Sequence, residues 1–153
     1  MTFSLLYPGT VMSADKQIEA NIAGIAQAVN TKNLANYGQL VTEDFLNMNR
    51  DLDGEVTSTV GRQSRLDLLE KFFEHSPFEI RATMKASGIH VDGQKAFAQV
   101  DGVLEFRPKN EGSLDAFKLY LDLFLFYTLD EQLGWLSERS MGIETRRGPI
   151  TEV

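Results

Sequence analysis

The sequence has no cysteine and only two histidines among its 153 residues. Without cysteine the chain forms no disulfide, no thiolate metal site and no cysteine nucleophile, while its cellular compartment stays open on this ground. His75 and His90 have no acidic or histidine neighbours at ligand spacing, and neither a serine elbow nor a glycine-rich phosphate loop is present. We therefore expect no metal site and no cofactor.

Basic runs and long apolar runs are also missing. Acidic residues outnumber basic ones by 22 to 15, which gives a net charge of −7 without any Lys/Arg-rich stretch. This charge repels phosphate backbones and anionic lipid, so no nucleic-acid or membrane partner is expected. Residues 1–13 lack the basic start of a signal peptide, and no charge-free segment is long enough to span a membrane. The sequence is typical of a soluble, cytoplasmic protein.

What is present fits one folded domain. A chain of 153 residues with 42% hydrophobic and 24% charged residues is large enough to bury a single core. We assign residues 1–12 to an N-terminal arm, 13–146 to the domain and 147–153 to a C-terminal tail.

Helical periodicity dominates the first half of the domain. Apolar residues recur at helical spacing after the capping residue Ser13, and again in the segments 33–45 and 62–76. A short strand over 45–52 and a loop over 53–61 separate the second helix from the third. The apolar faces of the three predicted helices are Ile18, Ile22, Ile25 and Val29; Leu34, Tyr37, Leu40 and Val41; and Leu66, Leu69 and Phe73.

An alternating pattern replaces the helical one from Phe78 onward. It predicts strands over 78–91, 95–107 and 116–129 and a fourth strand from Trp135, joined as an antiparallel meander.

The register of the first hairpin can be tested on the sequence. Asp92-Gly93 is a strong turn signal, but the resulting register soon places apolar side chains opposite acidic ones. One extra residue at Ser87-Gly88 repairs the match and pairs Met84 with Val100, which predicts a bulge there.

The segment 116–129 separates into two faces. If Phe106 pairs with Phe117, the face with Leu121, Leu123 and Leu125 lies under the helices. Asp122, the only carboxylate of this segment, then points outward opposite Asp101. The outward face also carries exposed aromatic residues, which predict a homodimer interface. We expect this interface to comprise Tyr120, Asp122, Phe124 and Phe126, with Phe97 and Val103 beside them.

The whole pattern resembles the nuclear transport factor 2-like superfamily over about residues 14–145. The resemblance depends on the segment NTKNLANYGQLVTEDF, on Gly61 before the third helix, and on Trp135 in GWLSERS at the last strand. It implies an α+β fold in which three N-terminal helices cover a cone-shaped, strongly bent antiparallel sheet. It further implies an apolar pocket and, often, a dimer formed through the outer face of the sheet.

The same resemblance does not select a reaction. The superfamily includes SnoaL-like polyketide cyclases, ketosteroid isomerases, dehydratases and epoxide hydrolases, as well as non-enzymatic transport and assembly domains.

Candidate site residues follow from the register of the last hairpin. If Leu129 pairs with Trp135, then Tyr127 meets Ser137 and Leu125 meets Arg139, with Met141 and Ile143 on the same face. The catalytic candidates are Asp44 as a base and Tyr37, Tyr127 and Arg139 as groups that polarise a carbonyl or hold a carboxylate. The candidate ligand-binding residues are Trp135, Ser137, Asn47, Leu121, Leu123, Leu125 and Phe73.

Two alternatives stay open at this point. Tyr37 and Trp135 fit equally as core aromatics, with Arg139 in a structural pair with Asp44 or Glu138. A slip of one residue in the last turn would instead bring Leu136, Glu138 and Ser140 to the interior. The apolar interior favours a homodimeric, SnoaL-like domain that binds a small hydrophobic molecule. The alternative is an acid–base polyketide cyclase, isomerase or dehydratase.

Overall fold

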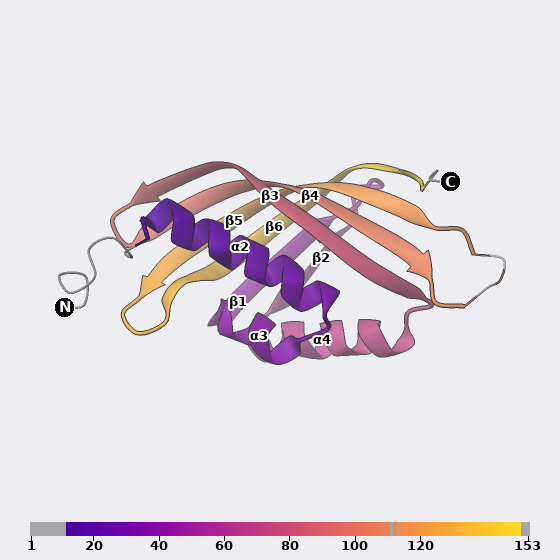
Figure 1. Cartoon of the computed structure of the whole chain (residues 1–153), viewed down its shortest axis with the longest axis horizontal. Helices are drawn as coiled ribbons and strands as arrows, with labels where there is room; N and C mark the ends of the chain where they lie inside the picture. The colour runs from indigo at the N-terminus through magenta and orange to yellow at the C-terminus, as the bar shows by residue number, and fades with distance from the viewer. Residues whose placement is uncertain (1–11, 111, 113, 151–153) are drawn as a thin grey trace.

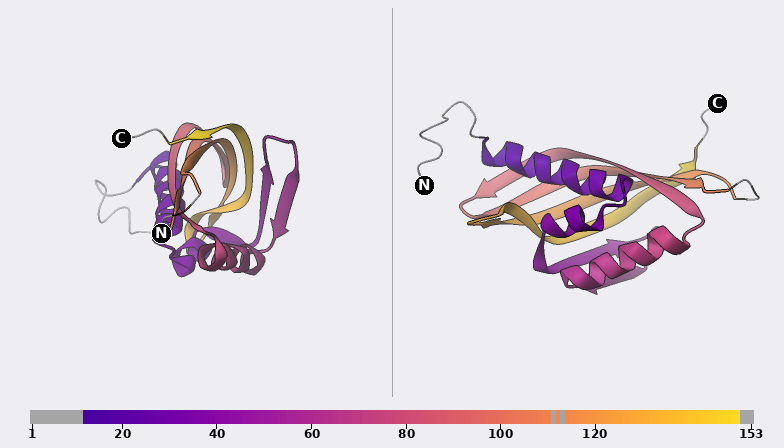
Figure 2. Two further views of the ribbon diagram at one scale, coloured as in Figure 1. Left: turned by 90° about the vertical axis from the view of Figure 1, so that its right-hand side faces the viewer. Right: turned by 60° about the horizontal axis from the view of Figure 1, so that its bottom comes forward.

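The computed structural model describes residues 12–110, 112 and 114–150, so nearly all of the predicted arm lies outside the described part. Six strands form one sheet in the order β2-β1-β6-β5-β4-β3, with the helices on one face, which we call the inner face (Figure 1). Figure 2 shows strands β3 to β6 arching over the helices. The elements are α2 (Ala14–Asn30), α3 (Leu34–Gln39), β1 (Val41–Arg50), β2 (Val56–Val60), α4 (Arg62–His75), β3 (Phe78–Asp92), β4 (Lys95–Pro108), β5 (Phe117–Asp130) and β6 (Gly134–Pro149).

Helix α2 has the cap and the apolar face that the sequence predicts. The Ser13 hydroxyl accepts a hydrogen bond from the Lys16 amide at 3.3 Å. Ile18 and Ile22 are buried in the main core cluster with residues of β4 and β5. At the other end of the helix, the Asn30 side chain donates to the Ala82 carbonyl at 2.9 Å, which ties α2 to β3. The helix is therefore attached to the inner face through its buried apolar residues and, at its C-terminal end, through Asn30.

The second predicted helix is shorter than expected, and the sheet contains a parallel pair. Helix α3 ends at Gln39, and the residues from Val41 to Phe45 belong to strand β1 instead. The cause is tertiary, because Val41 and Phe45 are buried in the core and β1 pairs in parallel with β6. The sheet is consequently mixed, whereas the sequence predicted antiparallel pairs only. The predicted loop over 53–61 contains β2, which pairs antiparallel with β1.

The antiparallel meander of four long strands is confirmed. For these four strands, each boundary that the sequence predicts differs from the observed one by no more than one residue, whereas the strand predicted over 45–52 is observed as β1 at Val41–Arg50. Strand β6 runs to Pro149, so Arg147 lies in the last strand and not in a tail. The predicted register between β4 and β5 is also correct, since Phe106 pairs with Phe117 and Asp101 with Asp122.

The predicted bulge in β3 is present, although the register beside it is shifted. Ala86 pairs with Val100 and Gly88 with Gln99, which leaves Ser87 as the extra residue. Met84 pairs with Gly102 and not with Val100, because the turn is formed by Gly93 and Gln94, with φ 63° at Gly93. The error is two residues, and an even shift leaves every side chain on its predicted face.

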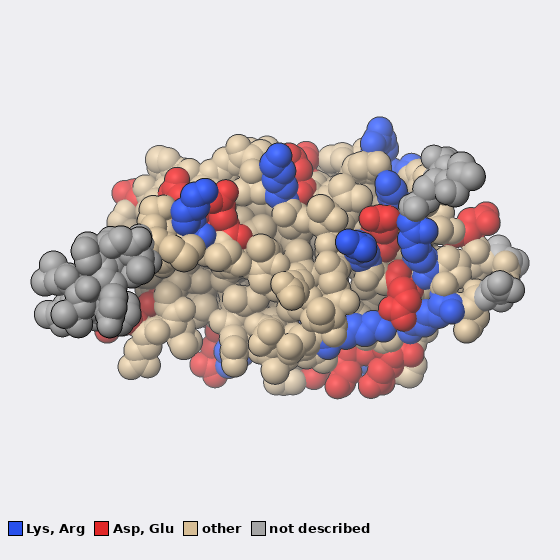
Figure 3. Space-filling view, in the orientation of Figure 1, with Lys and Arg blue, Asp and Glu red and all other residues tan. Residues whose placement is uncertain are grey.

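The described surface carries charges of both signs. On the face seen in Figure 3, most of the visible Lys and Arg side chains gather toward the right-hand end, with Asp and Glu side chains among them. Among the described residues, no helix is long and apolar enough to cross a membrane.

Candidate ligand-binding cavity

A cavity of about 320 Å³ lies between the helices and the inner face of the sheet. Its walls come from all three helices and from every strand. The apolar lining consists of Ile25, Val29, Phe45, Ala82, Met84, Leu104, Leu119, Leu121, Leu123 and Leu125. The polar lining consists of Tyr37, Asn47, Asn49, Arg50, Asp51, Glu55, Thr57, Arg65, Ser137, Ser140 and Glu144.

The apolar wall follows from the alternation in β5. Leu119, Leu121, Leu123 and Leu125 occupy every second position of the strand, so all four face the helices. The sequence predicted three of them as ligand-binding residues, and the structure places those three on the cavity. Their role in binding stays a prediction.

The polar wall is formed by β1 and β6, and two bulges in β6 decide its composition. Tyr127 pairs with Ser137 as predicted. Phe126, which precedes Tyr127 in β5, pairs with Arg139 and not with Glu138. Glu138 is therefore an extra residue, and it reverses the faces of β6 beyond it. Arg139 is exposed and does not line the cavity, which corrects its predicted placement.

The same reversal affects the rest of β6. Met141 and Ile143 pair with the outward residues Phe124 and Asp122, so their predicted inward placement is wrong. Ser140, which pairs with Leu125, lines the cavity instead. Ser140 belongs to the set that the alternative one-residue slip predicted.

Glu144 is the buried carboxylate of the cavity. It lies opposite Leu121, just before a second register shift, and only 7% of its surface is exposed. Arg147 binds it through two parallel hydrogen bonds, from Nε to Oε2 at 2.8 Å and from Nη2 to Oε1 at 2.9 Å. The hydrogen bond with Glu144 raises the pKa of the Arg147 guanidinium above its ordinary value. Arg147 therefore keeps its positive charge at neutral pH.

Gly142 brings β1 close to this carboxylate. It pairs with Asn49 on one side and Leu123 on the other. A Cβ atom at this glycine would lie 2.7 Å from Asn49 Oδ1 and 3.0 Å from a Leu123 methyl carbon. The missing side chain thus leaves the Asn49 amide room to lie across β6, between Ser140 and Glu144 along the strand.

Tyr37 lines the cavity, as the sequence analysis proposed. Its hydroxyl accepts a hydrogen bond from Arg65 Nε at 3.2 Å, and the guanidinium carbon of Arg65 lies 5.8 Å from the centre of its ring. Tyr37 is almost fully buried, so Arg65 closes the α4 side of the cavity over it.

Trp135 is a core residue, as the alternative interpretation held, and so is Tyr127, which the sequence analysis had placed at the cavity. The Tyr127 hydroxyl donates to Asn21 Oδ1 at 2.9 Å, and the Asn21 amide donates to the carbonyls of Leu40 and Trp135. Burial raises the pKa of Tyr127, with a smaller contribution from Tyr37. Neither Tyr127 nor Trp135 lines the cavity, because both are used in joining α2 to the sheet.

Two further predicted residues lie away from the cavity. Asp44 is exposed on β1 and accepts a hydrogen bond from the Thr42 hydroxyl at 3.0 Å. Its predicted position at a helix exit is wrong, because the strand alternation that buries Phe45 turns Asp44 to solvent. Phe73 packs edge-on against Phe72 in α4 and does not contribute to the lining.

Asn47 and Ser137 do line the cavity, and both are buried. The Ser137 hydroxyl donates to the Arg139 carbonyl at 3.3 Å. Thr59, which pairs with Asn47 from β2, has a buried hydroxyl oxygen without a hydrogen-bond partner among the described residues. Thr59 is not part of the cavity lining, so this unused hydrogen-bonding capacity lies beside the polar wall and not in it.

The sequence analysis did not predict that Glu144 and Asn49 line the cavity. It placed Ser140 there only in the alternative register of the last hairpin. Regular alternation from Trp135 places Glu144 on the outer face, and no turn or glycine signal in the sequence marks the extra residue at Glu138. In the part of the chain that the structure describes, no group of three or more His, Cys, Asp or Glu residues could hold a metal ion.

No family model and no curated protein matches the sequence. Solved structures do match, at low sequence identity. The hexachlorocyclohexane dehydrochlorinase LinA-type3 from Novosphingobium barchaimii LL02 matches with a TM-score of 0.75, 11% identity and 92% coverage of each chain. A putative scytalone dehydratase from Novosphingobium aromaticivorans DSM 12444 matches with a TM-score of 0.69 and 16% identity, over 100% of this chain and 94% of that one.

A third structure names the fold. An ntf2-like protein with a cystatin-like fold from Novosphingobium aromaticivorans matches with a TM-score of 0.64 and 15% identity, over 86% of this chain and 81% of that one. At these identities the comparisons concern the fold, and they agree with the predicted resemblance to the nuclear transport factor 2-like superfamily.

Proposed function

We propose that this chain, which has the nuclear transport factor 2-like fold, binds a small and largely apolar molecule in the cavity between its helices and its sheet. The observation that carries the proposal is the division of the lining into an aliphatic wall on β4 and β5 and a polar wall on β1 and β6. Ligand sites typically combine such an apolar surface with a few polar groups that orient the ligand.

The apolar wall supplies the main contribution to affinity. A phenyl-sized molecule that buries about 200 Å² of apolar surface gains roughly 5 kcal/mol from transfer out of water. The loss of translational and rotational freedom opposes this gain, so we expect a dissociation constant of roughly millimolar order for an unoptimised probe.

The proposal can be tested with benzyl methyl ether, a neutral probe without hydrogen-bond donors. Leu121→Phe adds volume to the cavity wall and should weaken binding at least about tenfold by NMR titration. Leu129→Phe is the matched control on the same strand, because Leu129 is exposed and outside the cavity lining. Equal binding by both variants would contradict the proposal.

An acid–base enzyme is the second candidate, and Glu144 favours it. A buried carboxylate in a largely apolar cavity can accept a proton from a bound substrate. The Tyr37 hydroxyl lines the same cavity and could stabilise the developing charge. The dehydrochlorinase and the putative dehydratase with similar structures carry names that fit this class of reaction. In this alternative Glu144 takes the role that the sequence analysis gave to Asp44.

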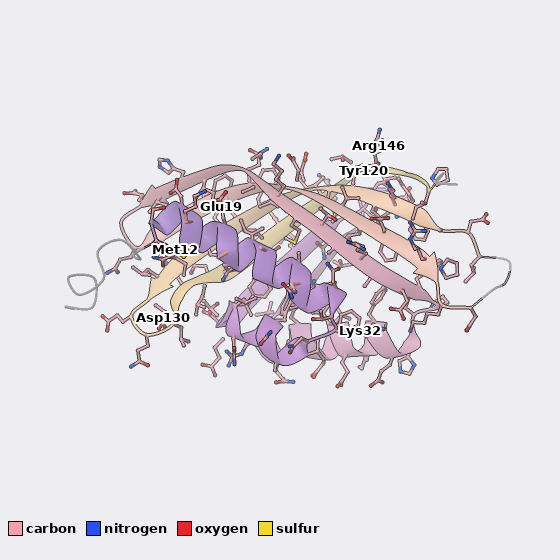
Figure 4. All side chains as sticks on the ribbon, in the orientation of Figure 1. Met12, Glu19, Lys32, Tyr120, Asp130 and Arg146 are labelled. Atoms are coloured by element: carbon pink, nitrogen blue, oxygen red, sulfur yellow. The ribbon has the colours of Figure 1, made fainter. Side chains whose placement is uncertain are left out.

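The outer face of the sheet supports a homodimer. Phe97 stacks on Phe124 with ring centres 6.1 Å apart and contacts Phe126 at 5.1 Å. Arg146 lies over the Tyr120 ring at 4.0 Å, and Figure 4 shows both residues on the side of the sheet away from α2. Aromatic rings that remain half-exposed in a single chain are typical of a protein interface.

A further inference from the structure

We infer that Glu144 makes the cavity selective for apolar molecules that carry one hydrogen-bond donor, a hydroxyl or an ammonium group, and that it disfavours carboxylates. The inference rests on the proposed binding function and specifies its ligand class. It starts from the position of Glu144, which is the one charged side chain among the buried residues of the described chain.

The first step concerns hydrogen-bonding capacity. An ionised carboxylate only accepts hydrogen bonds, and its two oxygens offer about four acceptor positions. Arg147 uses one position on each oxygen. Each oxygen of Glu144 therefore retains acceptor capacity, and no further hydrogen bond from a described residue uses it.

The second step concerns charge. Arg147 has half of its side-chain surface exposed, whereas only 5% of the Glu144 side chain is exposed. Solvent screens the cation more than the carboxylate. Asp51 and Asp53 also attract Arg147, and both help to raise the pKa of its guanidinium after the larger effect of Glu144. One exposed cation is thus shared by three carboxylates, which leaves the cavity side of Glu144 electronegative.

The third step concerns the neighbouring groups. The Asn49 side-chain oxygen lies against Gly142, next to Glu144 along the inner face of β6. The Ser137 hydroxyl donates its proton to the Arg139 carbonyl, so only its oxygen is available to a ligand. Acceptor oxygens of Glu144, Asn49 and Ser137 thus lie together on this part of the polar wall, which suits a ligand that donates. The cations of the lining are Arg65, which donates to the Tyr37 hydroxyl, and the exposed Arg50. A carboxylate would instead meet like charge and unpaired acceptors.

Four probes of similar size and shape test the inference. They are 2-phenylethanol, 2-phenylethylammonium, phenylacetate and benzyl methyl ether, which is an isomer of 2-phenylethanol without a donor. We expect the wild type to bind the alcohol and the ammonium ion at least about tenfold more tightly than phenylacetate, because a hydrogen bond to a charged group is worth this much or more. Isothermal titration at fixed salt and pH 7 measures the ratios.

Glu144→Gln removes the charge and keeps the shape of the side chain. The variant should bind the alcohol and the ammonium ion less than about threefold more tightly than phenylacetate, mainly because it loses affinity for the ammonium ion. Glu138→Gln is the matched control, because Glu138 lies on the same strand, pairs with Lys95 at 2.9 Å and is outside the cavity lining. The affinity ratios of Glu138→Gln for these probes should equal those of the wild type.

A second variant guards against misfolding of the first. Arg147→Gln removes the guanidinium that competes with a ligand for the Glu144 oxygens, so the ratio of ammonium to phenylacetate affinity should rise above the wild-type value. Benzyl methyl ether reports whether each variant still binds at all. Equal affinities of the wild type for this ether, the ammonium ion and phenylacetate would overturn the inference and leave the proposed function intact. Failure of all four probes to bind would overturn both.

Discussion

Glu144 is the residue on which the choice between binding and acid–base catalysis depends. Its carboxylate is buried in a largely apolar cavity, yet two hydrogen bonds from the Arg147 guanidinium already occupy part of its acceptor capacity. A generic proton-transfer substrate separates the two functions without knowledge of the natural ligand. The compound 5-nitrobenzisoxazole loses its ring C–H proton to a base while its N–O bond breaks, and it yields a coloured cyanophenolate.

If Glu144 acts as a base, the protein accelerates this reaction above the rate in buffer, and Glu144→Gln reduces the acceleration at least about tenfold. Absorbance of the phenolate gives the rate. Glu138→Gln is the control, because Glu138 is ion-paired and lies outside the cavity, and it should leave the acceleration unchanged. Equal rates for wild type and Glu144→Gln would exclude this residue as the base and leave the binding function.

Helix α4 differs from α2 in how firmly it is attached to the sheet. Ile18 and Ile22 of α2 are buried, whereas α4 has no buried residue along its described length from Arg62 to His75. Its apolar side chains border an open groove beside β3 and β4, which includes Leu68 and Phe72. Little apolar surface would therefore be exposed if α4 moved away from the sheet.

We expect backbone amides of α4 to exchange with solvent deuterium at least about tenfold faster than those of α2 under native conditions. The reason is that local opening of α4 disrupts fewer buried contacts. Hydrogen exchange measured by NMR or mass spectrometry compares the two helices within one sample. Equal protection of both helices would show that α4 opens only with the whole domain. Because α4 supplies Arg65 over Tyr37, its opening would also widen access to the cavity.

At the scale of the whole molecule, the proposed homodimer accounts for the half-exposed aromatic face of the sheet. Asp101 and Asp122 face each other on that surface, and Lys85 pairs with Asp101 from β3, although no ion pair of either aspartate is present among the described residues. A dimer would place these charges at or near its interface. We expect a solution mass of about twice 17.2 kDa.

Phe126→Lys should weaken the dimer at least about a hundredfold, since it removes a central aromatic ring and places a charge in the interface. Sedimentation velocity over a range of concentrations measures the change. Val60→Lys is a control on β2, where Val60 is already 68% exposed. A monomeric wild type, or an identical mass for both variants, would contradict the dimer.

The sequence by itself determined the features that depend on local periodicity. The cap at Ser13, the apolar face of α2, the long strands and the pairing of Phe106 with Phe117 were all predicted correctly. Even the bulge at Ser87 could be predicted, because a regular register would have set apolar residues against acidic ones. These features follow from the alternation of residues on neighbouring segments.

Only the tertiary structure decided which polar side chains enter the cavity. The extra residue at Glu138 reverses the faces of β6 because Ser137 and Arg139 must also match the parallel strand β1, a pairing that no local pattern reveals. The same pairing turns Asp44 outward and shortens the second helix. Alternation fixes the two faces of a strand only until one residue is inserted, and long-range packing selects where that insertion occurs.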